Sequence, residues 1–284
     1  MAKKDRKKGK ADKPGKKARK KATLASQADR HVLYEKSVQS PEDEIDLIRQ
    51  FYANHRKAKP RVLREDFCGT ATLTCEWIKA SPKHRGIGVD FDREVLDWGR
   101  ENNVGKLTAK QAERIQLIEA DVLAVETDPA DILVAFNFSY WTFQTRERML
   151  AYFRQALTSL SDDGLMLLDF YGGPDAFTEC VEKTKHEGFT YVWEQANYDP
   201  LSGSVDCFIH FHFPDRSKMQ PAFSYRWRLW TLPELRDVIL EAGFSDITVY
   251  WEQADDEGEG TGEYEAVERG EADPAWIVYV VAEP

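Results

Sequence analysis

Short apolar segments alternate with segments of helical spacing over residues 61–170, and this alternation limits the fold more than any other feature of the chain. The apolar segments are bounded by turn residues and span residues 61–64, 86–89, 115–119, 132–136 and 165–170. The segments of helical spacing span residues 72–80, 93–102 and 146–160. Because uninterrupted apolar strands are typical of a parallel sheet covered on both faces, we predict an open, doubly wound α/β domain. Such domains bind ligands at the carboxyl ends of their strands.

The flanking segments follow other patterns. Residues 40–52 predict a helix that begins at Ser40, with Pro41 at its first position. Three successive strands then predict an antiparallel insert over about residues 189–231. The remaining predicted elements are a helix over 233–242 and strands over 247–251 and 277–282. Residues 252–273 are acidic and glycine-rich, so we expect a solvated loop there.

Charge divides the chain into two parts. Residues 1–21 carry 12 Lys or Arg against two Asp, whereas the rest of the chain has 27 basic and 47 acidic residues, about −20. We interpret residues 1–28 as a basic, disordered tail and residues 29–284 as the folded domain. The acidic domain repels a phosphate backbone, so nucleic acid would be bound through the tail only, and a small-molecule partner is favoured. A tail that only improves solubility is an equal alternative.

The compartment is predicted from cysteine spacing and hydropathy. No apolar segment approaches the roughly 20 residues of a membrane span, so we expect no membrane partner. The four cysteines are Cys68, Cys75, Cys180 and Cys207. Their spacing matches no zinc site, which predicts free thiols in a reducing compartment, the cytosol.

A tight turn after the first predicted strand carries the strongest functional signal. Residues 62–74 pass from a strand through small residues around Gly69 into a helix, where backbone N–H groups can approach a ligand. Asp90 ends the next strand 21 residues later, and Asp121 follows the third. An acid at the second position can accept both hydroxyls of a ribose, so we expect a nucleotide-like ligand. The turn has one of the three glycines of a nicotinamide fingerprint, which disfavours a dehydrogenase.

These residues resemble a known family. The order Glu65-x-Phe67-Cys68-Gly69-Thr70-Ala71, then Asp90, then Ala120-Asp121-Val122, is similar to class I S-adenosylmethionine-dependent methyltransferases over roughly residues 30–284. The resemblance implies a Rossmann-like, seven-stranded, mostly parallel sheet whose last strand is reversed. This sequence differs from the family pattern at Phe67 and Ala71, which stand where the pattern has glycines. The insert is similar to those of small-molecule N- and O-methyltransferases of the glycine and amino-sugar type.

The resemblance also implies a cofactor, S-adenosyl-L-methionine, and a set of residues that hold it. Glu65 and the turn would hold the methionine part, Asp90 the ribose and Asp121 the adenine. Arg64 is unusual for the family, and we add it as a partner for the methionine carboxylate. Residues 33–39 resemble a lid over the cofactor, with Tyr34 as the main contact. The full set of predicted cofactor residues is Tyr34, Arg64, Glu65, Cys68, Gly69, Thr70, Ala71, Asp90, Phe91, Asp121, Val122 and Asn137.

Candidate residues for the acceptor follow from strand ends and strand faces. Methyl transfer from a sulfonium is an in-line displacement, so positioning supplies much of the catalysis. Tyr171 would position or deprotonate the acceptor, unless it is structural. His210 is the other candidate base. The alternative is that His210 and His212 are surface histidines without a role in the reaction. The spacing provides no third ligand beside these two histidines, so we predict no metal. The predicted acceptor contacts are Tyr140, His212, Arg226 and Arg228.

Three functions remain open at this point. The first is methyl transfer to nitrogen or oxygen of a small molecule. The second is methylation of RNA or a ribosomal protein delivered by the basic tail. The third is a cofactor-binding scaffold without catalysis, suggested by Phe67 in the turn. The acceptor and the oligomeric state are open as well.

Overall fold

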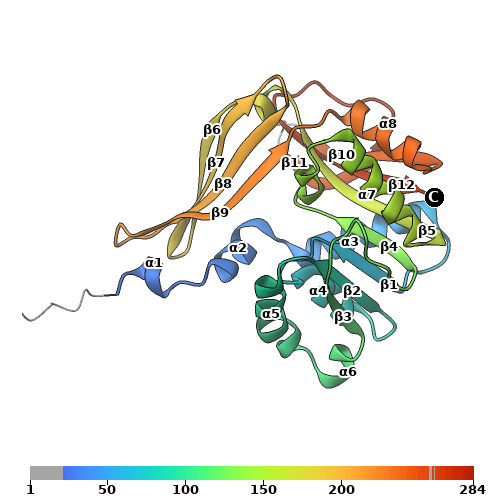
Figure 1. The fold of residues 1–284 in the computed structure, drawn as a ribbon, viewed down its shortest axis with the longest axis horizontal. Helices are drawn as coiled ribbons and strands as arrows, with labels where there is room; N and C mark the ends of the chain where they lie inside the picture. Colours follow the sequence, from blue (N-terminus) through green and yellow to red (C-terminus); the bar gives the residue numbers. More distant parts are fainter. Residues whose placement is uncertain (1–21, 256–257, 259) are drawn as a thin grey trace, which may run out of the picture.

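An eight-stranded sheet runs through the computed structural model, which describes residues 22–255, 258 and 260–284 (Figure 1). In their order across the sheet, the strands are β11 (Gly260–Val267), β10 (Asp246–Ala254), β12 (Trp276–Glu283), β5 (Leu160–Gly172), β4 (Ala130–Ala135), β1 (Val62–Asp66), β2 (Arg85–Asp90) and β3 (Ile115–Glu119). Strands β5, β4, β1, β2 and β3 are parallel, and β12 is antiparallel to both β5 and β10. The doubly wound sheet with a reversed last strand is therefore confirmed.

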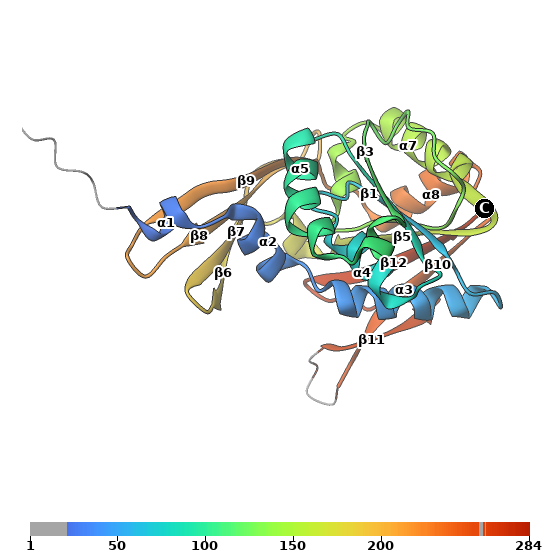
Figure 2. The ribbon, with the colours of Figure 1, turned by 90° about the horizontal axis from the view of Figure 1, so that it is seen from below.

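Helices cover both faces of the sheet (Figure 2). Helices α3 (Pro41–His55) and α4 (Thr72–Ala80) pack on one face, and α7 (Arg146–Thr158) and α8 (Leu232–Ala242) pack on the other. The remaining helices are α1 (Leu24–Gln27), α2 (Arg30–Val38), α5 (Arg93–Asn102), α6 (Ala109–Ala112) and the 3-10 turns η1 (Val104–Lys106), η2 (Ser139–Thr142) and η3 (Pro174–Phe177). Core side chains lie on both sides of the strands, which explains their uninterrupted apolar sequence.

The eighth strand corrects the prediction of a loop over residues 252–273. β11 pairs with β10 in antiparallel register at the edge of the sheet. Nearly all of its side chains are exposed, so its sequence is acidic and lacks the apolar alternation of a half-buried strand. Tyr264 and Val267 are partly buried, and the Tyr264 ring packs against Phe51 and Tyr279. The contact with Phe51 and a hydrogen bond from the Gln50 amide to the Tyr264 carbonyl tie the strand to α3.

The insert is a separate four-stranded antiparallel sheet that projects from the large one (Figure 1). Its strands are β6 (Cys180–His186), β7 (Phe189–Asp199), β8 (Ser204–His212) and β9 (Lys218–Arg228). The three predicted strands are present, but the insert begins nine residues earlier than the predicted residue 189, with β6. This edge strand is charged and largely exposed, so it gave no periodic signal.

The segment before α3 connects the insert to the main domain. The backbone N–H groups of Leu24 and Ala25 donate to Asp215 and Ser217 at the turn between β8 and β9, at 2.9 and 3.0 Å. Residues 24–28 were predicted as part of a disordered tail; instead, residues 24–27 form α1 and dock on the insert. Residues 1–21 of the predicted tail lie outside the described residues.

The cysteines and the helices can be compared with what the sequence predicted for them. All four cysteines are free, as expected from their spacing. Within the described ranges, no helix has the length and apolar character that crossing a bilayer requires.

Candidate functional site

The turn between β1 and α4 has left-handed backbone angles at three alternate positions, only one of which is glycine. Phe67, Gly69 and Ala71 all have left-handed backbone angles, with φ of 58°, 51° and 57°. This conformation costs a non-glycine residue about 1–2 kcal/mol. Backbone strain of this kind persists where the surrounding structure holds it, and it is concentrated at functional sites. The Phe67 ring packs against Phe143 and Tyr152, with centroids 5.9 and 5.7 Å away.

Backbone hydrogen bonds hold the turn against the end of β2. The N–H of Cys68 donates to the carbonyl of Val89 at 3.0 Å, and the N–H of Gly69 donates to the Asp90 carboxylate at 2.8 Å. The side chains of Cys68 and Ala71 are buried in a small apolar cluster with Leu96. These two residues therefore offer a ligand their backbone rather than their side chains.

Close packing of α5 supports the turn from behind. Gly99 of α5 lies so near the turn that a Cβ there would stand 2.5 Å from the Thr70 carbonyl oxygen. The Asn103 amide donates to this same carbonyl at 3.0 Å. A helix with any side chain at residue 99 would displace the turn.

Asp90 and Phe91 lie together at the carboxyl end of β2, as predicted. One Asp90 oxygen accepts from Gly69 and the other from the N–H of Asp92, at 2.9 Å. Burial raises the pKa of Asp90, and these N–H donors counteract the rise. Phe91 is 75% exposed, an unusual exposure for phenylalanine. An oriented carboxylate beside an open aromatic face suits a ribose joined to a flat base.

Residues at the end of β3 lie beside this pair. The Ala120 N–H donates to the Asp90 carbonyl at 3.0 Å, which places the following residue, Asp121, at the same edge of the sheet. Asp121 is exposed and accepts the N–H of Leu123 at 2.9 Å. Val122 is buried in the core, so its backbone is the part available to a ligand.

A buried carboxylate fixes the segment after β4. Asn137 and Phe138 have left-handed backbone angles, and their N–H groups donate to the Asp169 carboxylate at 2.6 and 3.0 Å. Burial raises the pKa of Asp169 to about 7. Asp169 was not among the predicted site residues. The sequence signal that could have identified it is an acidic residue near the end of an otherwise apolar strand. It positions Asn137 at the carboxyl end of the sheet.

Two predicted cofactor contacts are turned away from the turn's surface. Arg64 is fully buried and pairs with Asp66 at 2.7 Å, so pairing with a methionine carboxylate is wrong for this residue. Glu65 accepts the N–H and the hydroxyl of Thr74 in α4, and burial raises its pKa to about 8. Side chains alternate along a strand, so Glu65 reaches α4 on one face of the sheet while Arg64 reaches Ser159, just after α7, on the other.

Helix α2 is tied to the turn and to the insert at once (Figures 1 and 2). The Glu35 carboxylate accepts the hydroxyls of Thr70 and Thr72 at 2.8 Å and the amide of Asn103 at 2.7 Å. Tyr34 packs on Phe223 of β9 at 5.1 Å, and burial raises its pKa to about 12. The lid role of this segment stays a prediction, and Glu35, which makes these contacts, was not among the predicted residues.

Most predicted acceptor contacts are not brought to the site. Tyr140 is fully buried, and its hydroxyl donates to the Asp169 carbonyl at 2.6 Å, so it is a core residue. Ile209 and Phe211 pack in the cluster that contains α2 residues, which leaves His210, His212 and Arg226 on the opposite face of the insert. His210 shares a 2.8 Å hydrogen bond with Glu194 there. The prediction of His210 as a base facing the cleft is corrected accordingly.

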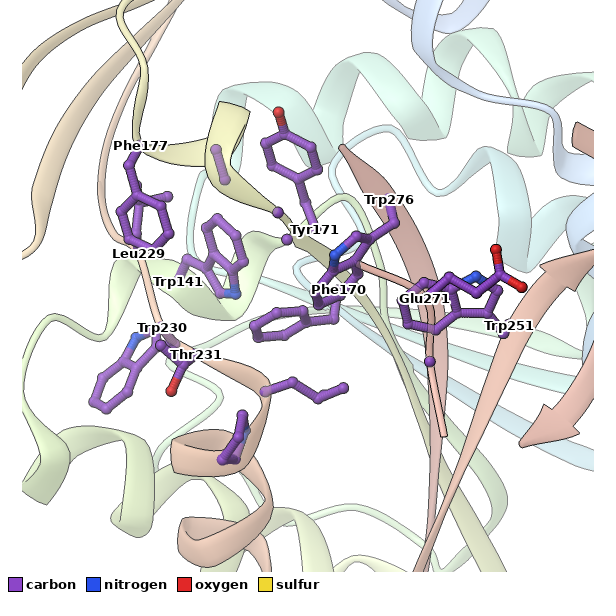
Figure 3. A pocket seen from close by; sticks show the side chains of 16 residues that line it. Trp141, Phe170, Tyr171, Phe177, Leu229, Trp230, Thr231, Trp251, Glu271 and Trp276 are labelled. Carbon is purple, nitrogen blue, oxygen red and sulfur yellow. The ribbon is translucent and has the colours of Figure 1, made fainter. Parts of the chain in front are cut away.

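An aromatic cavity opens at the carboxyl end of β5 (Figure 3). It measures about 300 Å³, and Tyr171 and four tryptophans line it. Tyr171 also lies 6.1 Å from the Phe138 ring, next to the segment that Asp169 fixes. Burial raises the pKa of Tyr171 to about 12, so its hydroxyl keeps its proton at neutral pH. Arg228, the remaining predicted acceptor contact, stacks on Trp230 of this cavity at 3.8 Å.

Comparison with known proteins shows the fold. No family model matches the sequence, and no curated protein matches it. Among solved structures, a S-adenosylmethionine-dependent methyltransferase from Clostridium acetobutylicum superimposes with a TM-score of 0.66 and 14% identity, over 89% of this chain and 96% of that one. CalS10, an amino pentose methyltransferase from Micromonospora echinaspora, gives 0.63 and 15% over the same shares, and DesVI from Streptomyces venezuelae gives 0.63 and 16%. The chain therefore has the fold of class I methyltransferases.

Proposed function

We propose that this chain is an S-adenosylmethionine-dependent methyltransferase that acts on a nitrogen or oxygen atom of a small molecule. The observation that carries the proposal is the turn, where Phe67 and Ala71 keep left-handed angles at a cost in energy and Gly69 orients the Asp90 carboxylate. The shared fold with small-molecule methyltransferases such as CalS10 supports it further. The predicted cytosolic location stays a prediction.

The residues at the turn fit the cofactor. The backbone of residues 68–71 would hold its amino-acid end, Asp90 its ribose hydroxyls, and Phe91 and Asp121 its adenine. Asn137, held by Asp169, would complete the site at β4. Helix α2 would cover it, since Glu35 already binds Thr70 of the turn.

The chemistry requires little of the protein beyond positioning. When bound, S-adenosylmethionine would supply an electrophilic methyl group, whose bond to sulfur breaks as an acceptor lone pair attacks the carbon in line, with S-adenosylhomocysteine as the leaving group. The chain's residues orient the acceptor and exclude water. Tyr171 keeps the proton on its hydroxyl and would donate a hydrogen bond to the acceptor. Deprotonation by Tyr171 is disfavoured because its pKa is raised.

The alternatives have less support. A domain charge of about −20 opposes the approach of RNA, and no structural neighbour cited above is named for a nucleic-acid substrate. A scaffold without catalysis was suggested by Phe67, yet this residue adopts a left-handed backbone angle that glycine would also adopt.

Calorimetry with S-adenosylhomocysteine tests the proposal. We expect Asp90→Ala to weaken binding at least about 30-fold, because charge-assisted hydrogen bonds contribute about 2 kcal/mol or more. Asp97→Ala removes an exposed carboxylate of α5 nearby and should leave the affinity within about twofold. Equal affinities for the Asp90 variant and the parent protein would refute the assignment.

A further inference from the structure

Helix α3 brings a carboxylate to the carboxyl edge of the large sheet. Its sheet-facing side carries Glu44, Ile48, Phe51 and His55 at helical spacing, and Ile48 and Phe51 are fully buried. At the opposite edge of the sheet, the His55 ring contacts Glu283 at the end of β12, at 2.9 Å. Because α3 runs along the sheet (Figure 2), Glu44, about three turns before His55, lies at the edge that holds the turn over residues 67–71.

The place of Glu44 at this edge is defined by the groups on which its charge acts. Burial is the main reason that the pKa values of Glu65, Asp169 and Tyr34 are raised, and the negative charge of Glu44 adds to the rise in each. Because such effects weaken with distance, Glu44 lies near all three groups. Glu65 belongs to β1 and Asp169 to β5, and β4 lies between these strands. Glu44 therefore stands near the end of β4, beside the turn.

The Glu44 carboxylate lacks a positive partner. Within the described part of the chain, no side chain donates a hydrogen bond to it and no Lys, Arg or His forms an ion pair with it; the Ser40 backbone N–H is the group that favours its charged form. Burial, and to a smaller extent the charge of Asp43, raises the pKa of Glu44 to about 7. Buried carboxylates in folded proteins are paired or neutral. A cationic group of a ligand would supply the missing partner.

The other carboxylates around the turn are already engaged. Glu65 accepts the N–H and the hydroxyl of Thr74. Asp169 accepts two backbone N–H groups of the segment after β4, and Asp90 accepts from the turn and from the residue that follows β2. The family resemblance gave Glu65 the methionine part of the cofactor, but its side chain reaches α4 instead. The amino-acid end of the cofactor therefore needs another negative group.

We propose that the Glu44 carboxylate binds the α-ammonium group in the methionine part of the cofactor. The inference rests on the proposed function, since it adds a residue to the same site. Backbone N–H groups of the turn and of the first turn of α4 suit the carboxylate of that amino acid. Its ammonium group carries only donors and requires an acceptor, and a negative acceptor gives the stronger hydrogen bond. Glu44 supplies such an acceptor at the adjoining strand end.

Calorimetry with three nucleosides on the full chain tests the inference. S-adenosylhomocysteine carries the ammonium group, its desamino analogue lacks only that group, and methylthioadenosine lacks the whole amino-acid end. In the parent protein, the desamino analogue should bind at least about tenfold more weakly than S-adenosylhomocysteine, because one charge-assisted hydrogen bond is lost. In Glu44→Gln, the affinities for these two should lie within about threefold of each other. Methylthioadenosine should bind the variant and the parent alike.

Asp43→Asn is the matched control for charge. It removes one negative charge from the neighbouring residue of α3, whose side chain is exposed. Exposed charges have weak effects in water, so the affinities of this variant for all three nucleosides should stay within about twofold of the parent values. A comparable loss of S-adenosylhomocysteine affinity in Asp43→Asn would show a general effect of charge on binding and would contradict a direct contact with Glu44.

The remaining outcomes separate this inference from the proposed function. The role of Glu44 is overturned if the desamino analogue binds the parent as tightly as S-adenosylhomocysteine, or if the tenfold preference persists in Glu44→Gln. Equal losses of methylthioadenosine and S-adenosylhomocysteine affinity in Glu44→Gln would give Glu44 a structural role instead. Each of these results leaves the methyltransferase assignment in place. A parent protein that binds none of the three nucleosides would overturn the proposed function, and this inference with it.

Discussion

At the scale of single residues, the site is shaped by backbone conformation more than by residue type. Phe67 and Ala71 are not glycines, yet both residues adopt left-handed backbone angles, which glycine adopts most readily. Phe67 is stabilised by its contacts with Phe143 and Tyr152. The left-handed conformation costs each residue about 1–2 kcal/mol, and packing contacts of this kind can offset that cost.

Substitutions of Ala71 should reveal this strain. Ala71 is fully buried with φ of 57°, so Ala71→Val should lower the free energy of unfolding by about 2–4 kcal/mol, through both the β-branched side chain and overpacking. Ala71→Gly relieves the strain but loses a buried methyl group and gains unfolded-state entropy, so it should stay within about 1 kcal/mol. Urea denaturation measures both. The control is Ala80→Val at an exposed helical position, which should lower the free energy of unfolding by less than about 1 kcal/mol. Similar losses of stability in Ala71→Val and Ala80→Val would contradict backbone strain at Ala71.

At the scale of elements, α2 couples the insert to the cofactor turn. Its N-cap Asp29 accepts the indole N–H of Trp98 in α5 at 2.7 Å, and Glu35 binds the turn. Tyr34 packs on β9. A single short helix thus holds three parts of the molecule together.

Glu35→Ala should loosen this connection. The variant leaves Thr70, Thr72 and Asn103 without their shared acceptor, so S-adenosylhomocysteine should bind about tenfold more weakly and amides of residues 30–38 should exchange faster. Calorimetry and hydrogen–deuterium exchange check the two effects. Lys36→Ala, at an exposed position of the same helix, should change neither. Unchanged exchange in Glu35→Ala would show that α2 is held by the insert alone.

The elements also show what the sequence could predict. The bounds of α4 and α5 agree with the predicted ranges, because turn residues and caps such as Asp92 mark them. Strands β6 and β11 were missed because exposed edge strands lack apolar alternation. Side-chain direction was the larger difficulty. Arg64 lies next to the turn in sequence, but its side chain contacts Asp66 and Ser159 in the interior. The direction of this side chain is decided by tertiary packing, which the sequence pattern does not show.

At the scale of the whole molecule, buried carboxyl groups set the dependence of stability on pH. Burial raises the pKa of Glu65 to about 8 and those of Asp169 and Glu44 to about 7. The folded state therefore binds protons that the unfolded state has already released at neutral pH. Stability must then fall as pH rises through these folded-state values.

Denaturation between pH 6.5 and 8.5 should show this fall. The pKa values of His31, His84 and His212 are lowered by burial, so these groups oppose the fall, chiefly at the lower end of the window where unfolded histidine is still about half protonated. The free energy of unfolding should decrease by on the order of 2–3 kcal/mol over the window. Glu65→Gln removes the group with the highest value and should flatten the curve. A stability that rises over the window in the parent protein would contradict the burial of these carboxyl groups.

The central claim is that the turn over residues 67–71 and Asp90 hold a sulfonium nucleoside. A crystal structure of the chain with S-adenosylhomocysteine tests it most directly. The account predicts the ribose hydroxyls on the Asp90 carboxylate, the amino-acid end along the backbone of Cys68 to Ala71, and the Phe67 ring still against Phe143 and Tyr152. Ligand bound elsewhere, or a Phe67 ring that occupies the space beside Asp90, would contradict it.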